Sequence, residues 1–181
     1  MAFVDERGLF PPCQHGFRKG YSTETATVQF VRYLHEQLDH KKYVVGVFFD
    51  LSRAFDSVNH ELLARKLSDL GFRGCVNSWL LSYVRNRHMV VDINGVLSDD
   101  YAVSLGTPQG GSLAPLLFLL YVADLPYSVT SGRLFTYADD TTIVVAASDP
   151  ATIVTKVNQA IEEFSGWCRR NSLVLNSSKT V

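Results

Sequence analysis

Three aspartates are the residues of this sequence best suited to chemistry. Asp139 and Asp140 are adjacent, and the β-branched and aromatic residues on both sides of them predict a hairpin with the two carboxylates at its tip. Asp50 ends a separate apolar run, residues 43–49, and a buried strand has little reason to finish on an unpaired charge. If the two strands are neighbours, three carboxylates converge at one sheet edge and suit two divalent cations of the Mg²⁺ kind. The alternative is that the aspartate pair is ordinary turn chemistry on a surface hairpin.

The composition limits the class of protein. With 181 residues, of which 46% are hydrophobic, the chain can bury one substantial core, as one domain or as one domain and part of another. Its net charge of −1 indicates that any contact with nucleic acid is local or is made by other sequence. The longest apolar run, residues 113–123, is far shorter than the roughly 20 residues that span a bilayer, and residues 1–8 lack the apolar segment of a signal peptide. We therefore expect no membrane association.

Cysteine and histidine usage bears on redox compartment and on zinc. Cys13, Cys75 and Cys168 are odd in number and far apart, which is typical of reduced thiols in an intracellular compartment, the nucleus or the cytoplasm. The histidines form neither a HExxH pattern nor a ligand spacing with the cysteines, which argues against zinc.

The elements that must position the aspartates follow from periodicity and capping. Helices are predicted after the caps Ser22 or Thr23, Asn59, and Asp149, and over residues 113–125. A further helix is predicted in a segment with Val76, Trp79, Leu80, Tyr83 and Val84 on one face. Strands are predicted over residues 89–93 and 101–105, joined through Asn94-Gly95, and over residues 173–175. Residues 106–111 are a glycine-rich loop. This order predicts an α+β, ferredoxin-like unit, a mainly antiparallel sheet with helices on one face.

Five segments in chain order resemble the motifs of reverse transcriptases. Residues 48–56, 106–115 and 137–140 resemble motifs A, B and C, residues 14–23 resemble the fingers segment before motif A, and residues 173–180 resemble motif D. The residues of these motifs are most similar to those of non-LTR (LINE-like) retrotransposons, and group II intron enzymes are the next most similar group. The resemblance implies a polymerase palm in residues 43–181 preceded by partial fingers in residues 1–42, without the upstream fingers or a thumb.

The resemblance also implies a two-metal nucleotidyl transfer, in which a primer 3′-hydroxyl attacks the α-phosphate of a dNTP and pyrophosphate leaves. Asp50 and Asp139 would hold two Mg²⁺ or Mn²⁺ ions, the backbone carbonyl of Leu51 would add a ligand, and Asp140 would support the site less directly. Lys179 matches the motif D lysine proposed to protonate pyrophosphate, although a charge near the chain end can equally be ordinary surface. The implied partners are an RNA template, a DNA primer and dNTP, and the oligomeric state is not indicated.

A nucleotide site is implied by the same motifs. Phe55 would lie against the sugar C2′ and exclude a 2′-hydroxyl, unless it is simply a core residue. Gln109 and Gly110 match the motif B residues that line the incoming nucleotide, and glycine lets the backbone come close. Arg18 and Lys19 would hold the triphosphate through their donors, or else are solvated surface charges.

Other charged residues near these segments have plainer interpretations. Asp56 and Asp124 are interpreted as capping or surface charges. Arg85, Arg87 and His88 end a predicted helix, where they are either solvated or in contact with a template backbone.

Three functions therefore compete. The first is the catalytic palm of an RNA-directed DNA polymerase. The second is a truncated, non-enzymatic remnant that binds nucleic acid or protein. The third is an RNA-templated RNA polymerase, against which Phe55 and the pair Tyr137-Ala138 count. Because duplex binding depends on many phosphate contacts, this stretch alone is expected to hold template and primer weakly.

Overall fold

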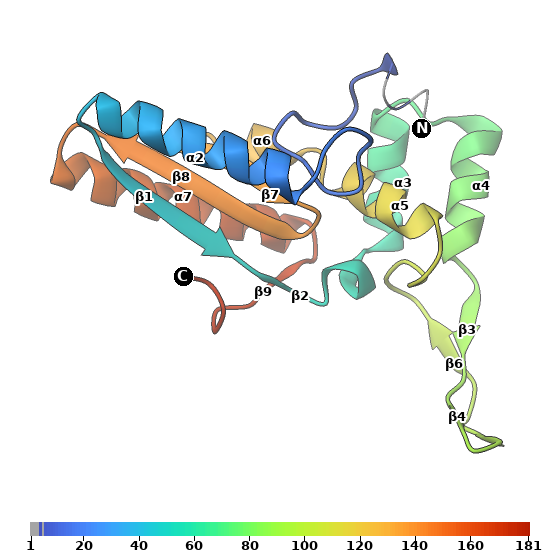
Figure 1. The fold of residues 1–181 in the computed structure, drawn as a ribbon. Helices are drawn as coiled ribbons and strands as arrows, with labels where there is room; N and C mark the ends of the chain where they lie inside the picture. Colours follow the sequence, from blue (N-terminus) through green and yellow to red (C-terminus); the bar gives the residue numbers. More distant parts are fainter. Residues whose placement is uncertain (1–3, 5) are drawn as a thin grey trace.

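The fold is built on a three-stranded antiparallel sheet, shown in Figure 1. The structure, a computed structural model, describes residues 4 and 6–181. Strand β8 (Asp140–Ala147) lies in the middle, between β1 (Tyr43–Phe49) and β7 (Arg133–Tyr137). Along β8 the alternate residues Thr141, Ile143, Val145 and Ala147 are buried on one face, and Val144 is buried on the other, so both faces of the central strand are covered.

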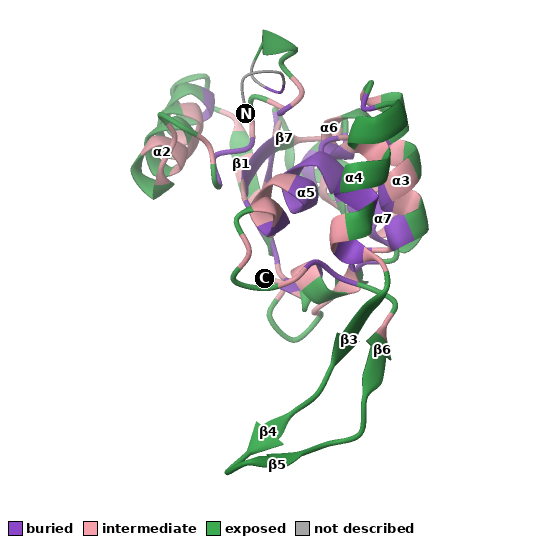
Figure 2. Ribbon diagram, turned by 90° about the vertical axis from the view of Figure 1, so that its right-hand side faces the viewer, coloured by how far each residue is buried: buried purple, intermediate pink, exposed green. Residues whose placement is uncertain are grey.

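Helices cover both faces of this sheet. On one face, Phe30 of α2 (Thr23–Asp39) lies 6.2 Å from Phe48, ring centre to ring centre. On the other, Phe164 of α7 (Pro150–Arg170) lies 4.3 Å from Phe49. Because Phe48 and Phe49 are consecutive in β1, they point to opposite faces, and Figure 2 shows α2 and α7 on opposite sides of the sheet. The α+β class with antiparallel pairing is confirmed. The prediction of helices on one face was made for residues 43–181, to which α7 belongs, whereas α2, on the other face, precedes that range. The boundary at residue 42 stays a prediction.

The helix starts follow from side-chain caps, as the sequence predicts. Ser22 accepts a hydrogen bond from a backbone N–H in the first turn of α2 and forms a capping box there. Asn59 accepts two such bonds at the start of α3 (His60–Asp69), and Asp149 accepts one at the start of α7. These contacts span three residues or fewer, which is why sequence alone finds them.

A helical layer formed by α3, α4 (Gly74–Val84), α5 (Leu113–Tyr121) and α6 (Leu125–Ser128) completes the core. The prediction for α4 is wrong in part. Leu80 and Val84 are buried, but Val76 and Trp79 are 53% and 59% exposed. The side of α4 that carries Leu80 and Val84 is buried, and α3 packs on α4. Apolar periodicity alone did not indicate which part of the apolar face another helix would bury.

The predicted helix over residues 113–125 is also too long, because α5 ends at Tyr121. Pro126, which follows in α6, has no backbone N–H to donate to Val122 and its ring would clash with that carbonyl. The chain therefore breaks before Leu125 and starts a new short helix.

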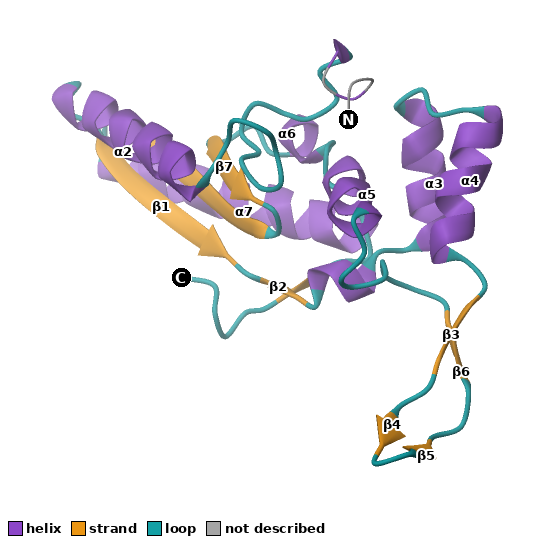
Figure 3. Cartoon of the chain, turned by 45° about the vertical axis from the view of Figure 1, so that its right-hand side comes forward, coloured by secondary structure: helices purple, strands orange, loops and turns teal. Residues whose placement is uncertain are grey.

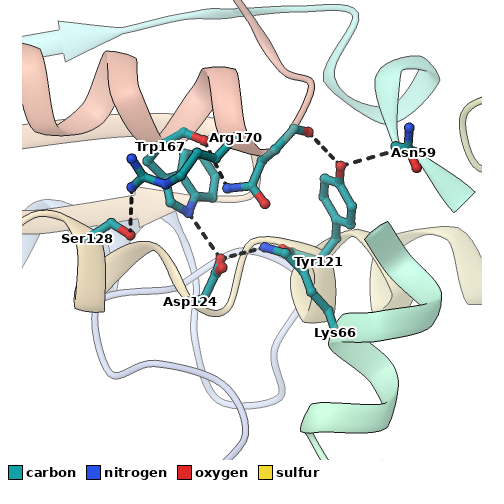
Figure 4. Close-up of polar contacts among 8 residues, drawn as sticks. Asn59, Lys66, Tyr121, Asp124, Ser128, Trp167 and Arg170 are labelled. Atoms are coloured by element: carbon teal, nitrogen blue, oxygen red, sulfur yellow. Dashed lines mark hydrogen bonds and ion pairs between the residues drawn. The ribbon is translucent and has the colours of Figure 1, made fainter. Parts of the chain in front are cut away.

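A polar network inside this layer joins α3, α5 and α7 (Figure 4). The Lys66 ammonium donates to the Tyr121 carbonyl and to Asp124 Oδ1, both at 2.6 Å. Asp124 Oδ1 also accepts the indole N–H of Trp167 at 3.1 Å, and the Tyr121 hydroxyl donates to the Asn171 carbonyl at 2.5 Å. Asp124 stands at the N-cap position of α6 with its side chain 47% exposed, so its interpretation as a capping or surface charge holds in part. Its carboxylate caps no backbone N–H, however, and instead joins three elements.

A two-stranded arm, residues 87–103, projects from the body, as Figure 3 shows. At its base β3 (Arg87–Met89) pairs with β6 (Tyr101–Val103), and at its tip β4 (Asp92–Ile93) pairs with β5 (Val96–Leu97). The turn at residues 94–95 joins β4 to β5, as Asn-Gly predicts, with positive φ at both positions. The predicted strand over residues 89–93 is instead broken at residues 90–91, where the N–H of Val91 donates to the Ser98 hydroxyl across the arm, and the predicted strand over residues 101–105 ends at Val103.

The last strand, β9 (Val174–Leu175), pairs with β2 (Leu51–Ser52) rather than with the main sheet. After it the chain turns back, and Val181 exchanges two backbone hydrogen bonds with Phe48 on the free edge of β1. The C-terminal segment therefore wraps around the end of β1. Within residues 4 and 6–181, none of the helices is long and apolar enough to cross a membrane, and all three cysteines are free.

Candidate active site

The pairing of β1 with β8 brings the three aspartates together. Phe49 is paired with Thr141, so Asp50, the next residue of one strand, falls beside Asp140, the preceding residue of the other. Asp139 lies one position further, in the two-residue turn that joins β7 to β8. The convergence of two distant segments is therefore confirmed, and both strand ends deliver a carboxylate to the same corner of the sheet.

The electrostatics of this corner are unfavourable without a cation. Asp139 is half-buried, and burial is the largest cause that raises the pKa of its carboxyl group. The negative charges of Asp140 and Asp50 raise that pKa further, against a lowering by a backbone hydrogen bond at Asp139 itself. A carboxylate with two anionic neighbours is stabilised when a cation lies among them.

The donor set fits divalent cations that bind with the substrate. Across residues 4 and 6–181, no three His, Cys, Asp or Glu side chains already form a cage for a metal ion. Mg²⁺ seldom uses such a cage, because it keeps waters and is typically held by one or two carboxylates together with substrate phosphates. Asp50, Asp139 and Asp140 are oxygen donors of that kind, and the carbonyl of Leu51 as a further ligand stays a prediction.

The C-terminal segment supplies two partners for Asp50. The side-chain amide of Asn176 donates to Asp50 Oδ2 at 2.8 Å, and the backbone N–H of Asn176 donates to the Asp50 carbonyl at 2.9 Å. Lys179 Nζ lies 3.8 Å from Asp50 Oδ2 and remains 69% exposed. Lys179 therefore lies at the candidate site, as its place in the sequence suggests. Asn176 was missed as a site residue, although it directly follows the strand of residues 173–175 and lies within the segment that resembles motif D.

The glycine-rich loop is fixed against the segment after Asp50. The N–H of Thr107 donates to the Phe55 carbonyl at 2.9 Å, and His60 Nε2 lies 2.8 Å from the Gly106 carbonyl oxygen. A Cβ atom on Gly106, whose φ is +86°, would lie 2.8 Å from the Cα of Asp56. Glycine is therefore required here both by the left-handed backbone and by the close approach of the two segments.

A pocket opens between this loop and Phe55. Phe55, Gln109 and Gly110 line it together with Gly111, Ser112, Ala114 and Pro115, and its volume is about 570 Å³. The Phe55 ring also stacks on Phe118 with 4.3 Å between ring centres, so it is at once a packing residue and part of the pocket wall. Gln109 Nε2 donates to Asp56 Oδ1 at 2.8 Å, so Asp56 is exposed, as interpreted, but also holds Gln109.

The basic residues of the N-terminal loop divide in role. The guanidinium of Arg18 donates to the carbonyls of Pro11 and Gln14 at 3.0 and 2.8 Å and lies over the ring of Tyr21 at 4.1 Å. Lys19 is exposed. Arg18 thus holds the loop together in this structure, and triphosphate binding by either residue stays a prediction.

Two of the three residues in the basic cluster at the base of the arm have a carboxylate partner, and the guanidinium of the third, Arg87, lies 6.0 Å from the ring centre of Tyr83. Arg85 pairs with Glu61 at 2.6 Å, and His88 Nδ1 lies 2.7 Å from a carboxylate oxygen of Asp100. Both pairs are exposed to solvent, which favours the solvated interpretation.

Comparison with known proteins identifies the class. Residues 3–181 match the family of reverse transcriptases (RNA-dependent DNA polymerases), so this chain belongs to the reverse transcriptase family. Among curated relatives, it is 32% identical over 185 residues to a probable RNA-directed DNA polymerase from transposon BS of Drosophila melanogaster, covering 98% of this chain and 20% of that protein. It is 30% identical over 184 residues to the corresponding protein of the transposon X-element of the same species, covering 99% of this chain and 20% of the relative. The family expected from the motifs, non-LTR type included, is confirmed.

Solved structures confirm the fold. A telomerase from Candida albicans, in complex with a fragment of telomeric RNA, superposes with a TM-score of 0.71 at 15% identity, over 99% of this chain and 33% of that chain. Apo telomerase from Candida tropicalis gives a TM-score of 0.70 at 16% identity, over 99% and 34%. The polymerase palm fold is therefore shared at low identity. This chain spans about a fifth of the length of the curated relatives named above.

Proposed function

We propose that this chain carries the catalytic palm of an RNA-directed DNA polymerase that adds dNTP to a primer 3′-hydroxyl. The observation that carries the proposal is the register of β1 with β8, which sets Asp50 beside Asp140 and next to the Ala138–Asp139 turn. Membership of the reverse transcriptase family supports it independently. The RNA template and DNA primer are part of this proposal, since the relatives are much longer than this chain.

Asp50 and Asp139 are the proposed holders of two Mg²⁺ or Mn²⁺ ions, with the Leu51 carbonyl as a further ligand and Asp140 in a supporting role. When bound, two such ions stabilise the charges on the attacking and leaving oxygens of an in-line displacement. Lys179, with its ammonium 3.8 Å from Asp50, is the proposed proton donor to the leaving pyrophosphate.

Selection of the nucleotide is assigned to the pocket beside Phe55. Its volume is in the range of small-molecule sites, and the Phe55 ring is fixed by Phe118, so it cannot easily turn away from a 2′-hydroxyl. Gln109 and Gly110 line the same pocket and would contact the incoming nucleotide. Arg18 and Lys19 are the proposed triphosphate contacts, and Arg18 would have to exchange a carbonyl for a phosphate oxygen.

Primer extension on a poly(rA) template with an oligo(dT) primer tests the function. We expect extension with dTTP and Mg²⁺ or Mn²⁺, and a fall of about 10²–10³-fold or more in Asp50→Asn, because charge stabilisation at the reacting oxygens is lost. Asp39→Asn, the same change on an exposed residue at the end of α2, should keep the native rate. Thermal unfolding should show both variants folded.

Three results would point elsewhere. An unchanged rate in Asp50→Asn would refute the assignment of the site. Extension with UTP but not with dTTP would indicate an RNA-templated RNA polymerase. No extension with either would leave a non-catalytic domain that binds nucleic acid or protein, or a palm whose activity needs the remaining sequence of its longer relatives.

A further inference from the structure

The loop that precedes α2 is added to the free edge of β7. Gln14 forms a parallel bridge with Thr136. The N–H of Thr136 donates to the Cys13 carbonyl at 2.9 Å, and the N–H of His15 donates to the Thr136 carbonyl at 2.8 Å. The loop therefore pairs through a single bridge with β7, the strand that leads into the candidate catalytic turn.

The side chain of Gln14 continues this pairing into the turn itself. Its Nε2 donates to the Ala138 carbonyl at 3.1 Å, and its Oε1 accepts the N–H of Ala138 at 2.8 Å. The same Oε1 accepts the N–H of Gly16 at 2.7 Å. Gln14 is only 2% exposed, so these three bonds are shielded from water and an apolar replacement has no solvent to substitute for them.

The turn needs such support. Ala138 has a φ of +56°, a left-handed conformation that residues with a Cβ atom rarely adopt. Asp139, the next residue, faces the repelling charges of Asp50 and Asp140. Both features favour a turn that relaxes away from Asp50 when nothing holds it.

Gly16 and Arg18 show that the contact is built into the loop. A Cβ atom on Gly16 would lie 2.3 Å from the backbone nitrogen of Ala138, so only glycine lets the loop approach this closely. Arg18 donates to the Gln14 carbonyl at 2.8 Å, and the His15 ring is held by a hydrogen bond of 2.9 Å with Thr25 Oγ1 in the first turn of α2. Gln14 is therefore anchored from both sides.

We propose that Gln14 is a positioning residue that fixes the Ala138–Asp139 turn and so holds the Asp139 carboxylate beside Asp50. The proposal rests on the proposed function for its catalytic consequence, but the fixing of the turn is a property of the chain by itself.

Amide hydrogen exchange followed by NMR on the native chain tests the fixing of the turn. The N–H of Ala138 has the Gln14 amide as its partner, so we expect its exchange to be slowed at least about tenfold relative to an unprotected amide. An unprotected Ala138 amide in the native chain overturns the proposal without any variant.

Gln14→Met, which keeps the volume and removes the three hydrogen bonds, tests the consequence. Gln37→Met is the matched control, since Gln37 is also a buried amide, 7% exposed, but lies near the end of α2, where it accepts from Lys42. In Gln14→Met we expect Ala138 exchange to be about tenfold faster and Mn²⁺ affinity, from the EPR signal of free Mn²⁺, to be about tenfold weaker. In primer extension kcat should fall about tenfold or more with little change in the KM for dTTP, because the metal carboxylate and not the nucleotide pocket has moved.

The outcomes separate this proposal from the proposed function. Equal changes in both variants, or Mn²⁺ affinity and kcat that stay native in Gln14→Met, would overturn the positioning role. If the native chain neither binds Mn²⁺ nor extends a primer, the proposed function fails together with the catalytic consequence, while Ala138 exchange still decides whether Gln14 fixes the turn.

Discussion

At the residue scale, the ionised carboxylate of Asp139 is expected to lower the stability of the fold when no cation is bound. Burial, and then Asp140 and Asp50, raise the pKa of Asp139, so its ionised form is less favourable in the folded than in the unfolded chain. We expect Asp139→Asn to stabilise the chain at neutral pH without divalent cations, by about 1 kcal/mol or less, because the group is only half-buried. Thermal unfolding should show a rise in Tm of up to about 2–4 °C for a chain of this size.

The pH dependence identifies the cause. A carboxyl group with a raised pKa in the fold destabilises it only when ionised, so the effect is absent below about pH 4 and grows as pH rises through the folded pKa. The gain in Tm from Asp139→Asn should therefore vanish at acid pH. Asp149→Ala, which removes the α7 cap and a carboxylate of lowered pKa, should change Tm in the opposite direction at neutral pH. A lower Tm for Asp139→Asn at neutral pH would contradict this account.

At the element scale, the arm is separable from the core. Seven of its large apolar side chains are each 48–72% exposed: Met89, Val90, Val91, Ile93, Val96, Leu97 and Tyr101. A two-stranded ribbon of this kind has marginal stability in water and adds little to the fold. We expect replacement of residues 90–100 by Asn-Gly, which still joins Met89 to Tyr101, to change the free energy of unfolding by less than about 0.5 kcal/mol in urea.

Phe49→Ala in β1 is the control variant for that deletion, because it removes a side chain from the core. Phe49 is 3% exposed and packs on Phe164, so its removal should destabilise the chain by about 3–5 kcal/mol. A loss above about 2 kcal/mol on shortening the arm would show that the arm contributes to the core.

At the scale of the whole molecule, the Lys66–Asp124 pair fastens α3 to the α5–α6 connection and to α7 (Figure 4). The Lys66 side chain is 15% exposed and that of Asp124 is 47% exposed. Burial lowers the pKa of Lys66, and Asp124 opposes that shift. Removal of Asp124 therefore leaves the mostly buried cation of Lys66 without a carboxylate, whereas removal of Lys66 leaves the partly solvated anion of Asp124.

We expect the two single variants to lose different amounts of unfolding free energy, measured by equilibrium unfolding. Asp124→Ala should cost about 2–3 kcal/mol, because Lys66 keeps its charge without a carboxylate partner. Lys66→Met should cost about 1 kcal/mol, since Asp124 keeps water and the Trp167 N–H. The double variant should resemble Lys66→Met. A larger loss in Lys66→Met than in Asp124→Ala would mean that the packing of the lysine, and not its charge, dominates.

The amino-acid sequence by itself determined the local features of this protein. The caps Ser22, Asn59 and Asp149 act within three residues, and the strand ending at Asp50 and the turn at Asp139 follow from residue types that are close neighbours in the chain. The motif order was likewise enough to indicate the family, which the comparisons confirm.

Tertiary structure decided which distant groups meet. Nothing local to Gln14 indicates that its amide reaches Ala138, and nothing local to Asp124 indicates Lys66 as its partner. Periodicity placed Trp79 on an apolar face but could not say that α3 covers the other side of α4. The physical reason is that capping and turn preferences act between neighbours along the chain, whereas hydrogen bonds and burial across it depend on strand register and helix packing, which exist only once the whole chain has folded.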